Sequence, residues 1–466
     1  MTEQGNIFPK TPTGIDGLDE ITYGGFPKGR PILICGGAGC GKTLMAIQFL
    51  VKGITDYGEP GVFMSFEEST SDLTQNVKSL GFDLEELKAE NKLRVDYVYV
   101  ERSEIEETGD YDLEGLFVRL NYAIDAIGAK RVVLDTIESL FSGLNNTAIL
   151  RSELRRLFRW LKEKGVTTIV TGEKGDTTFT RQGLEEYISD CVIFLDFRVI
   201  DQIATRRMRI VKYRGSTHGT NEYPFLIDES GISVIPVTSL KLDFTSSNEI
   251  ISTGLPALNM LFSRGGIYKN SSTLITGTAG TSKTILASYF AMSSCERNEP
   301  VLYFSFEESP DQLIRNMLTI GLDFRPIVSA KLMHIHSSRP SLQGLELHLL
   351  SLFKLIREIN PKTVIIDPIS SLISIGSSSE VRAMLVRLMD MLKMKEINAL
   401  FTCLTSSQFD SVTGDISSLS DTWINLSNTE EDSGRSRSLN IVKTRGMGHS
   451  NKSQYFNITN EGIQLI

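Results

Sequence analysis

Two glycine-rich segments of the chain have the composition and spacing of loops that bind nucleotide phosphates. The first, GGAGCGKT at residues 36–43, matches the pattern G-x-x-x-x-G-K-[ST] at every position. In such a loop the backbone N–H groups wrap the phosphates, and the start of the following helix adds positive potential. Lys42 is expected to reach the β- and γ-phosphates of ATP, and Thr43 to bind Mg²⁺. The predicted ATP contacts are Gly37, Ala38, Gly39, Cys40, Gly41, Lys42 and Thr43.

The second segment, GTAGTSKT at residues 277–284, departs from the pattern at one position, because Ser282 replaces the last glycine. A serine is disfavoured wherever the backbone φ must be positive, but it is tolerated if the residue has the dihedrals of an ordinary helix start. We predict that this site still binds nucleotide; a degenerate, purely structural site is the alternative. The predicted contacts are Thr278, Ala279, Gly280, Thr281, Ser282, Lys283 and Thr284.

An aspartate ends an apolar run in each half of the chain, at Asp135 after VVL and at Asp367 after VII. This is the position of a Walker B acid, which holds Mg²⁺ or its water. An aspartate that caps the exit of a strand is the structural alternative. The predicted metal ligands are Thr43, Asp135, Thr284, Asp367 and Glu307.

A pair of glutamates follows a second apolar run in each half. Glu67 and Glu68 come after VFMSF, and Glu307 and Glu308 come after LYFSF. A carboxylate beside the γ-phosphate can orient and deprotonate a nucleophile. Two solvated glutamates at a helix start are the alternative for a single pair, but the recurrence favours chemistry. We predict that these four residues are catalytic, one of each pair acting and its neighbour assisting.

The elements that must position these residues occur twice. Five blocks begin at residues 13, 36, 62, 132 and 210, and they recur in the same order from 253, 277, 302, 364 and 441. Such repetition indicates a tandem duplication. We predict two domains, residues 1–240 and 241–466, each long enough for a single α/β domain.

Each half reads as alternating strands and helices. RPILICGG and STLITG are short apolar runs that end in glycine, which is typical of strands, and apolar residues at helical spacing follow both. VVLD and VIID are continuously apolar, as in strands buried on both faces of a parallel sheet. The predicted fold class is α/β, with tandem P-loop NTPase domains that each have a mainly parallel sheet flanked by helices.

Composition narrows the possible partners and compartments. The 466 residues carry a formal net charge of −9, without the basic footprint that nucleic-acid binding usually leaves. No apolar run approaches the roughly 18 residues of a membrane span, and the N-terminus does not resemble a signal peptide. Five scattered cysteines without a CxxC pair indicate a reducing compartment. We therefore expect a cytoplasmic protein that binds neither membranes nor nucleic acid.

The two P-loops, the two glutamate pairs and two K-x-R-G segments together resemble the KaiC family of clock ATPases and autokinases. The resemblance extends over nearly the whole chain. It implies a double RecA-like domain, ATP and Mg²⁺ as cofactors, and a homohexameric double ring with ATP between subunits.

The same resemblance implies that basic residues reach the nucleotide of the adjacent subunit. In the family such cations neutralise charge that develops on the transferred phosphoryl group. From the sequence alone, basic residues on a strand edge are more often simply solvated. The residues concerned are Lys212, Arg214 and His218 in the first ring, and Arg437, Lys443, Arg445 and His449 in the second.

The polar segment DISSLSDT, residues 415–422, raises a further question. The offset between the two K-x-R-G segments aligns Ser417 and Ser418 with Glu186 and Tyr187 of the first half. In the KaiC family this place holds the autophosphorylated pair, so the resemblance implies phosphorylation of both serines. A polar turn is the alternative.

We therefore predict an ATP-hydrolysing hexamer with serine autokinase and autophosphatase activity, acting as a timing or signalling regulator. Glu67 would be the base for water in the first ring, and Glu307 the base for the acceptor hydroxyl in the second. The alternatives are a RecA-like nucleic-acid ATPase and a signalling scaffold that ATP merely assembles. The family pattern also admits a KaiB-like partner. A KaiA-like partner is not expected, because the chain stops at Ile466, soon after IVKTRG.

Overall fold

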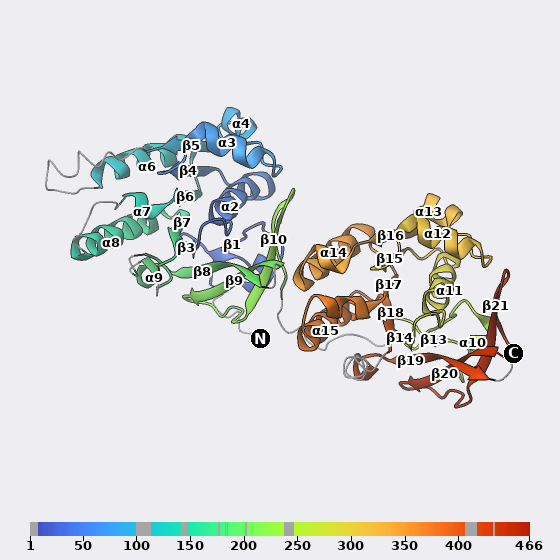
Figure 1. Ribbon diagram of the computed structural model, residues 1–466. Helices are drawn as coiled ribbons and strands as arrows, with labels where there is room; N and C mark the ends of the chain where they lie inside the picture. The colour runs from blue at the N-terminus through green and yellow to red at the C-terminus, as the bar shows by residue number, and fades with distance from the viewer. Residues whose placement is uncertain are drawn as a thin grey trace, which may run out of the picture. The chain divides into compact units, whose positions relative to one another are not determined.

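The computed structural model describes residues 8–98, 113–140, 147–175, 178–181, 183, 185–200, 203–236, 247–405, 417–431 and 434–466. The chain divides into two compact units, Met1–Thr238 and Ser239–Ile466, which are described separately (Figure 1). The boundary predicted between residues 240 and 241 lies outside the described residues.

A nine-stranded sheet forms the centre of the first unit, with its strands in the spatial order β11-β10-β9-β8-β3-β7-β6-β4-β5. The strands from β8 to β5 in that order are parallel, whereas β9, β10 and β11 continue the sheet antiparallel. The strands span Pro31–Gly36 (β3), Gly61–Ser65 (β4), Leu93–Tyr97 (β5), Arg131–Asp135 (β6), Thr167–Glu173 (β7), Cys191–Ile200 (β8), Ile203–Tyr213 (β9), Glu222–Asp228 (β10) and Gly231–Val234 (β11).

Helices cover both faces of this sheet (Figure 1). They span Leu18–Ile21 (α1), Lys42–Tyr57 (α2), Thr70–Lys78 (α3), Leu84–Ala89 (α4), Glu114–Ile127 (α6), Ile137–Leu140 (α7), Thr147–Lys164 (α8) and Glu185–Ile188 (α9), and a separate antiparallel pair joins Lys10–Thr11 (β1) to Phe26–Pro27 (β2).

Successive residues of β6 pack into different apolar layers. Val133 belongs to the cluster that includes α2, α3 and α4, whereas Val132 and Leu134 belong to the cluster built with α6 and α8. All three side chains are fully buried. The prediction that VVLD is a strand buried on both faces of a mainly parallel sheet is therefore confirmed.

The second unit repeats this plan with a nine-stranded sheet in the order β16-β15-β17-β18-β14-β19-β20-β21-β22. Its strands span Ser272–Gly277 (β14), Val301–Ser305 (β15), Met333–Ser337 (β16), Thr363–Asp367 (β17), Asn398–Leu404 (β18), Thr422–Glu431 (β19), Gly434–Thr444 (β20), Gln454–Thr459 (β21) and Gly462–Leu465 (β22), preceded by the pair Ile250–Ile251 (β12) and Ile267–Tyr268 (β13). Its helices span Pro256–Asn259 (α10), Lys283–Glu296 (α11), Pro310–Leu318 (α12), Arg325–Ser329 (α13), Leu345–Ile359 (α14) and Ser378–Met394 (α15), with 3₁₀ turns at Pro340–Leu342 (η1) and Ile369–Ser374 (η2).

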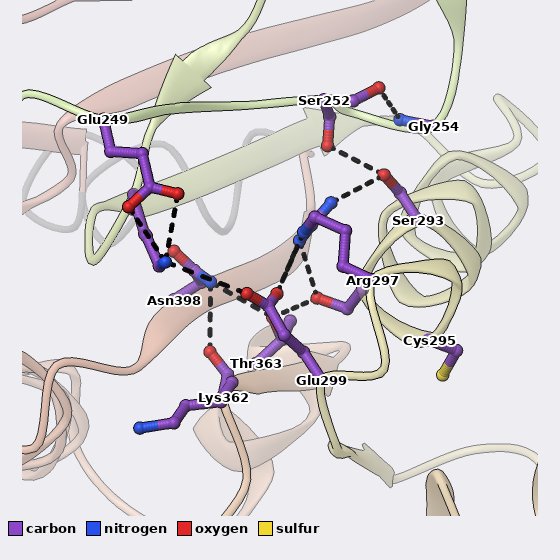
Figure 2. A network of polar contacts seen from close by, with 12 residues as sticks. Glu249, Ser252, Gly254, Ser293, Cys295, Arg297, Glu299, Lys362, Thr363 and Asn398 are labelled. Carbon is purple, nitrogen blue, oxygen red and sulfur yellow. Dashed lines mark hydrogen bonds and ion pairs between the residues drawn. The ribbon is translucent and has the colours of Figure 1, made fainter.

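A glutamate stands two residues before corresponding strands of the two units, Glu59 before β4 and Glu299 before β15. The arginine that neutralises it comes from a different element in each unit. In the first unit Arg131, at the start of β6, is wholly buried and donates from Nε to Glu59 at 2.7 Å. In the second unit a threonine occupies that strand position, and Arg297 at the end of α11 supplies the guanidinium. Figure 2 shows Arg297 between Glu299, 3.0 Å from its Nε, and Ser293, 2.9 Å from Nη1. The duplication has thus preserved the carboxylate, which needs a cation, rather than the source of the cation.

None of the helices within the described ranges combines the length and the apolar character that crossing a membrane requires.

Candidate functional site

The first P-loop joins the carboxyl end of β3 to the start of α2. Gly39 and Gly41 have φ angles of +70° and +101°, in the left-handed region that favours glycine. The side chain of Lys42 folds back over the loop and donates to the carbonyl oxygens of Gly36 at 3.0 Å and Gly37 at 2.9 Å. The strand, the loop and the lysine at the helix start therefore have the arrangement that a phosphate cradle requires.

The hydroxyl of Thr43 and the carboxylate of Asp135 lie together beside this loop. Thr43 Oγ1 donates to Asp135 Oδ2 at 2.9 Å, and Thr171 Oγ1 donates to Oδ1. Burial raises the pKa of Asp135 above its ordinary value, and the two hydroxyl hydrogen bonds oppose that shift. A hydroxyl and a buried carboxylate are oxygen ligands of the kind that Mg²⁺ prefers, so these residues fit a magnesium ion.

Two hydroxyl groups that follow the carboxyl end of β6 hold the carboxylate of Glu67. Its Oε1 accepts from Thr136 Oγ1 and from Ser139 Oγ, both at 2.7 Å. Glu68 is directed elsewhere, because its Oε2 accepts a weak 3.5 Å bond from Asn76 on α3. The carboxyl ends of β3, β4 and β6 form one edge of the parallel sheet, so Glu67 and Asp135 lie at the same edge as the P-loop.

The second P-loop has the same form but carries backbone strain. Lys283 Nζ donates to the carbonyls of Gly277 at 2.9 Å and Thr278 at 2.8 Å, and burial lowers the pKa of this lysine. Ser282 has φ +76° and ψ +29°, which is the left-handed conformation. Serine can replace glycine without strain only where the residue has the dihedrals of an ordinary helix start. Ser282 does not have them.

Replacing Ser282 by glycine is expected to stabilise the second unit by about 0.5–1 kcal/mol, because relief of roughly 1–2 kcal/mol of left-handed strain exceeds the entropy that glycine adds to the unfolded chain. Urea unfolding measures this effect, followed by the fluorescence of Trp423 with Trp160 replaced by phenylalanine. These are the only two tryptophans of the chain, one in each unit.

The reverse change in the first unit is the matched comparison. A Cβ at Gly41 would lie 2.9 Å from Ile227 Cδ1, and the φ of this residue is also positive. Gly41→Ser is therefore expected to destabilise the first unit by about 1 kcal/mol or more, with Trp160 as the probe. A Ser282→Gly protein less stable than wild type would contradict the strain assignment.

The Walker B acid of the second unit has a partner that the first unit lacks. Tyr303, fully buried on β15, donates from its hydroxyl to Asp367 Oδ2 at 2.8 Å, and Thr402 donates to Oδ1. Phe63 stands at the position of Tyr303 in the first unit. A phenol in the second unit thus takes the carboxylate oxygen that Thr43 takes in the first. Asp367 keeps its carboxylate at the P-loop edge, where it and Thr284 offer oxygen ligands that suit Mg²⁺.

The two carboxylates of the second glutamate pair have different partners, as in the first pair. Glu307 Oε1 accepts from Ser371 Oγ at 3.0 Å, which is the counterpart of the bond from Ser139 to Glu67. Glu308 instead accepts from Asn316 on α12 at 3.2 Å, and burial raises the pKa of Glu308. In both units the first glutamate of the pair is the one directed toward the Walker B turn.

Cations of the K-x-R-G segments contact the residues just before β8 in the first unit and just before β19 in the second. Each of these strands lies beside the P-loop strand in its sheet. In the first unit Lys212 Nζ donates to the carbonyl of Glu186 at 2.9 Å. In the second unit Lys443 Nζ donates to the carbonyl of Ser417 at 2.6 Å, and Arg445 donates to the carbonyl of Ser418. The structure therefore brings the backbone of Ser417 and Ser418 against two of the cations singled out in the sequence.

An aspartate anchors each of these arginines. Arg214 lies 3.7 Å from Asp190, and Arg445 lies 3.6 Å from Asp421. Asp421 also accepts from the backbone N–H and the hydroxyl of Ser272, at the start of β14. The cations and the serines are therefore fixed at the amino end of the P-loop strand.

These cations lie level with the amino ends of the parallel strands, whereas the P-loop of the same unit lies at the carboxyl ends. Tyr213 pairs with Cys191, which pairs with Ile32, four residues before the end of β3 at Gly36. At about 3.3 Å per residue this is roughly 13 Å along the strands, and β9 is two strands from β3, roughly 10 Å further across. The second unit has the same register, since Thr273 pairs with Thr422 and Thr422 with Thr444. The K-x-R-G residues of one chain therefore do not meet the P-loop of the same unit.

The remaining predicted contacts are dispersed along the antiparallel strands and their turns. His218 stacks on Tyr213 with ring centroids 6.4 Å apart, and its Nδ1 lies 2.9 Å from the carbonyl of Gly219. Arg437 lies on β20 opposite Asn428, and His449 forms an isolated bridge with Phe262. His218 and His449 follow the ends of β9 and β20 that lie away from the P-loop. Arg437 instead lies on the P-loop side of its sheet, because its partner Asn428 is two residues beyond Leu426, which pairs with Gly277.

Several residues of the site were not singled out in the sequence. The threonines that bind the Walker B acids and the serines that bind the first glutamate of each pair recur at corresponding places, so the repeat itself was an available signal. They are Thr171, Thr402, Ser139 and Ser371. Tyr303 had no such signal, because phenylalanine stands at its place in the first half.

Comparison with known proteins gives one consistent result. The family model described as "ATPase: KaiC" matches residues 11–239 and again residues 251–466. The circadian clock protein KaiC2 of Synechocystis sp. is 53% identical over 98% of this chain and 81% of its own length. The circadian clock oscillator protein KaiC of Synechococcus elongatus is 37% identical over 98% of this chain and 89% of its own. The protein of that name from Thermostichus vulcanus is 37% identical over 100% and 90%.

Proposed function

This chain belongs to the KaiC family of ATPases, and from that premise we propose that it self-assembles and phosphorylates and dephosphorylates its own serines. One observation carries the proposal. Lys443 and Arg445 hold the backbone of Ser417 and Ser418, at the edge of the sheet opposite the P-loop of the same unit. A cation cluster wrapped around two hydroxyl-bearing residues suits an anion at that place, and phosphoserine is such an anion.

The position of the serines supports the participation of a second copy of the chain. A phosphoryl group on the P-loop of the second unit is too far from the serines of the same unit, so we infer that transfer takes place between copies. Heterologous contacts of this kind close into a ring when the rotation permits it. A homohexamer with ATP at its subunit interfaces, as the family resemblance implies, satisfies this requirement in both units.

The first unit is proposed to hydrolyse ATP. Lys42 and the backbone N–H groups of the P-loop bind the phosphates, and Glu67 takes the proton of the attacking water. Thr136 and Ser139 orient the carboxylate of Glu67 by donating to the same oxygen, which leaves the other oxygen for the water. A magnesium ion held by Thr43 and Asp135 would supply charge neutralisation when bound.

The second unit is proposed to transfer the γ-phosphoryl group to Ser417 and Ser418 of a neighbouring copy. The seryl oxygen forms the new bond to phosphorus, the bond to the β-phosphate oxygen breaks, and the hydroxyl proton passes to Glu307. Ser371 orients that carboxylate in the same way as Ser139 orients Glu67. The reverse reaction or hydrolysis at the same place removes the phosphate.

A timing or signalling role is proposed from the relatives, whose names describe circadian clock proteins. In that role ATP hydrolysis and a reversible phosphate mark would together report elapsed time. A KaiB-like protein is the partner that the family pattern suggests for the first unit.

The mass of the intact protein after incubation with Mg·ATP tests the proposal. Wild type is expected to gain the mass of one or two phosphates, and Ser417→Ala/Ser418→Ala is expected to gain none. Ser411→Ala, four residues before the segment, is the control variant and should behave as wild type. ATP hydrolysis without any gain in mass would leave an ATPase whose second unit only binds nucleotide, and DISSLSDT would then be a polar turn.

A further inference from the structure

A cleft of about 670 Å³ opens beside Glu307 in the second unit. Its walls include Phe306 and Glu307 after β15, Arg339 after β16, and Ser371 and Ser374 on η2. The described part of its wall therefore combines one carboxylate, one guanidinium and several hydroxyl groups at the carboxyl ends of parallel strands.

The described wall of the cleft borders the phosphate cradle without including it. Leu404, which pairs with Gly277 at the end of the P-loop strand, belongs to its wall. Within the described residues, the wall contains no residue from 278 to 284, so a group in the cleft would contact Glu307 without contacting the P-loop. This is where the acceptor, rather than the ATP, would lie.

Arg339 is an exposed cation without a hydrogen-bond or ion-pair partner in the part of the chain that the structure describes. The segment that carries it is nevertheless firmly attached to the catalytic turn. Ser337 Oγ donates to the carbonyl of Glu308 at 2.7 Å, and Ser338 N–H donates to the carbonyl of Ser305 at 3.1 Å. The guanidinium is therefore carried on a backbone whose position relative to the glutamate pair is fixed.

A buried histidine holds the other side of the same segment. His348 is 0% exposed, and its Nε2 donates to the carbonyl of Pro340 at 3.0 Å. Its ring packs edge-on against Phe306, with centroids 5.3 Å apart. Such support on both sides is what a binding site needs if a long side chain is to meet its ligand in one geometry.

We propose that this cleft binds the phosphate group after it leaves ATP, with Arg339 as its principal cation. The inference rests on the proposed phosphoryl transfer. A guanidinium presents paired donors that match two phosphate oxygens, and the serine hydroxyls of the wall supply further donors.

Two sources of phosphate share this chemistry, a phosphoseryl side chain and released inorganic phosphate. Calorimetry on the full-length protein, with both nucleotide sites filled by a non-hydrolysable ATP analogue and Mg²⁺, separates them. The probes are orthophosphate and a peptide of residues 411–422 phosphorylated at Ser418, with the unphosphorylated peptide as a blank. Because no transfer occurs, the result does not depend on whether the protein phosphorylates itself.

Arg339→Gln is expected to weaken binding of the preferred probe roughly 10- to 100-fold, as loss of a charged pair of hydrogen bonds implies. Arg339→Lys keeps the charge and should lose less. The exposed Arg264, on another part of the unit, supplies the matched control Arg264→Gln, which should bind both probes as wild type does.

Tighter binding of the phosphopeptide than of orthophosphate identifies phosphoserine as the ligand, and the opposite order identifies released phosphate; both support the site. Unchanged affinities in Arg339→Gln would overturn the proposal, as would a wild-type protein that binds neither probe. The affinity of the second unit for the ATP analogue should be the same in every variant, which checks that each is folded.

Discussion

Replacing Glu67 by glutamine is expected to reduce steady ATP hydrolysis by about 10²–10⁴-fold and to leave ATP binding unchanged. Glutamine has the shape of glutamate and can still accept from Thr136 and Ser139 through its carbonyl oxygen. It cannot take a proton from water. The loss should therefore appear in turnover and not in affinity, and it is measured by phosphate release together with nucleotide binding at equilibrium.

The duplicated second unit provides the matched comparison. Glu307→Gln is expected to abolish phosphate incorporation and to leave most of the ATP hydrolysis, because the first unit is intact. Conversely, Glu67→Gln should still gain phosphate mass. If both variants lost hydrolysis and incorporation to the same extent, the assignment of one activity to each unit would be wrong.

The second member of each pair is a further control. Within the described residues, the carboxylate of Glu68 accepts from Asn76 at 3.5 Å, and that of Glu308 accepts from Asn316 at 3.2 Å. Both are directed away from the Walker B turn, so Glu68→Gln should reduce hydrolysis much less than Glu67→Gln. A larger effect at Glu68 would exchange the roles of the two glutamates.

The parts of the site that follow from local sequence were predictable. A glycine-rich turn between a strand and a helix, an acid after an apolar run and a repeated block are each defined by a few neighbouring residues. For that reason the P-loop, the Walker B aspartate and the glutamate pair of each unit follow the carboxyl ends of the parallel strands in the sheet of that unit, as the strand pattern implies. The parallel strands buried on both faces were equally visible, since VVLD has no polar face.

The rest depends on packing between distant segments. The left-handed conformation of Ser282 is imposed by the path of the loop from β14 to α11, which the residue type does not reveal. The bond from Tyr303 to Asp367 exists only because β15 and β17 are neighbours in the sheet. Likewise, the contact of Lys443 with Ser417 joins segments that the sequence alone could align but not place in space.

Mixing two inactive variants of the first unit is expected to restore ATP hydrolysis. Lys42→Ala removes the cation of the P-loop, and Arg214→Ala removes the cation proposed to reach the neighbouring nucleotide. Each variant alone should lose roughly 10³-fold or more, as arginine fingers and P-loop lysines do. In a ring with heterologous interfaces, about a quarter of the interfaces of an equal mixture join an intact P-loop to an intact arginine, so about a quarter of the wild-type rate should return.

The geometry makes this result specific to contact between copies. Arg214 lies at the amino edge of the sheet, and the P-loop of its own unit lies at the carboxyl edge, so the two cannot cooperate within one chain. Arg30 is the matched control, because it also pairs with Asp190, at 3.6 Å, but is not among the residues predicted to contact ATP. Arg30→Ala should therefore stay within a few-fold of the wild-type rate. An equal mixture that shows exchange of subunits by mass and yet remains inactive would mean that Arg214 acts within its own chain, by holding Asp190 and the segment from Glu186 in place.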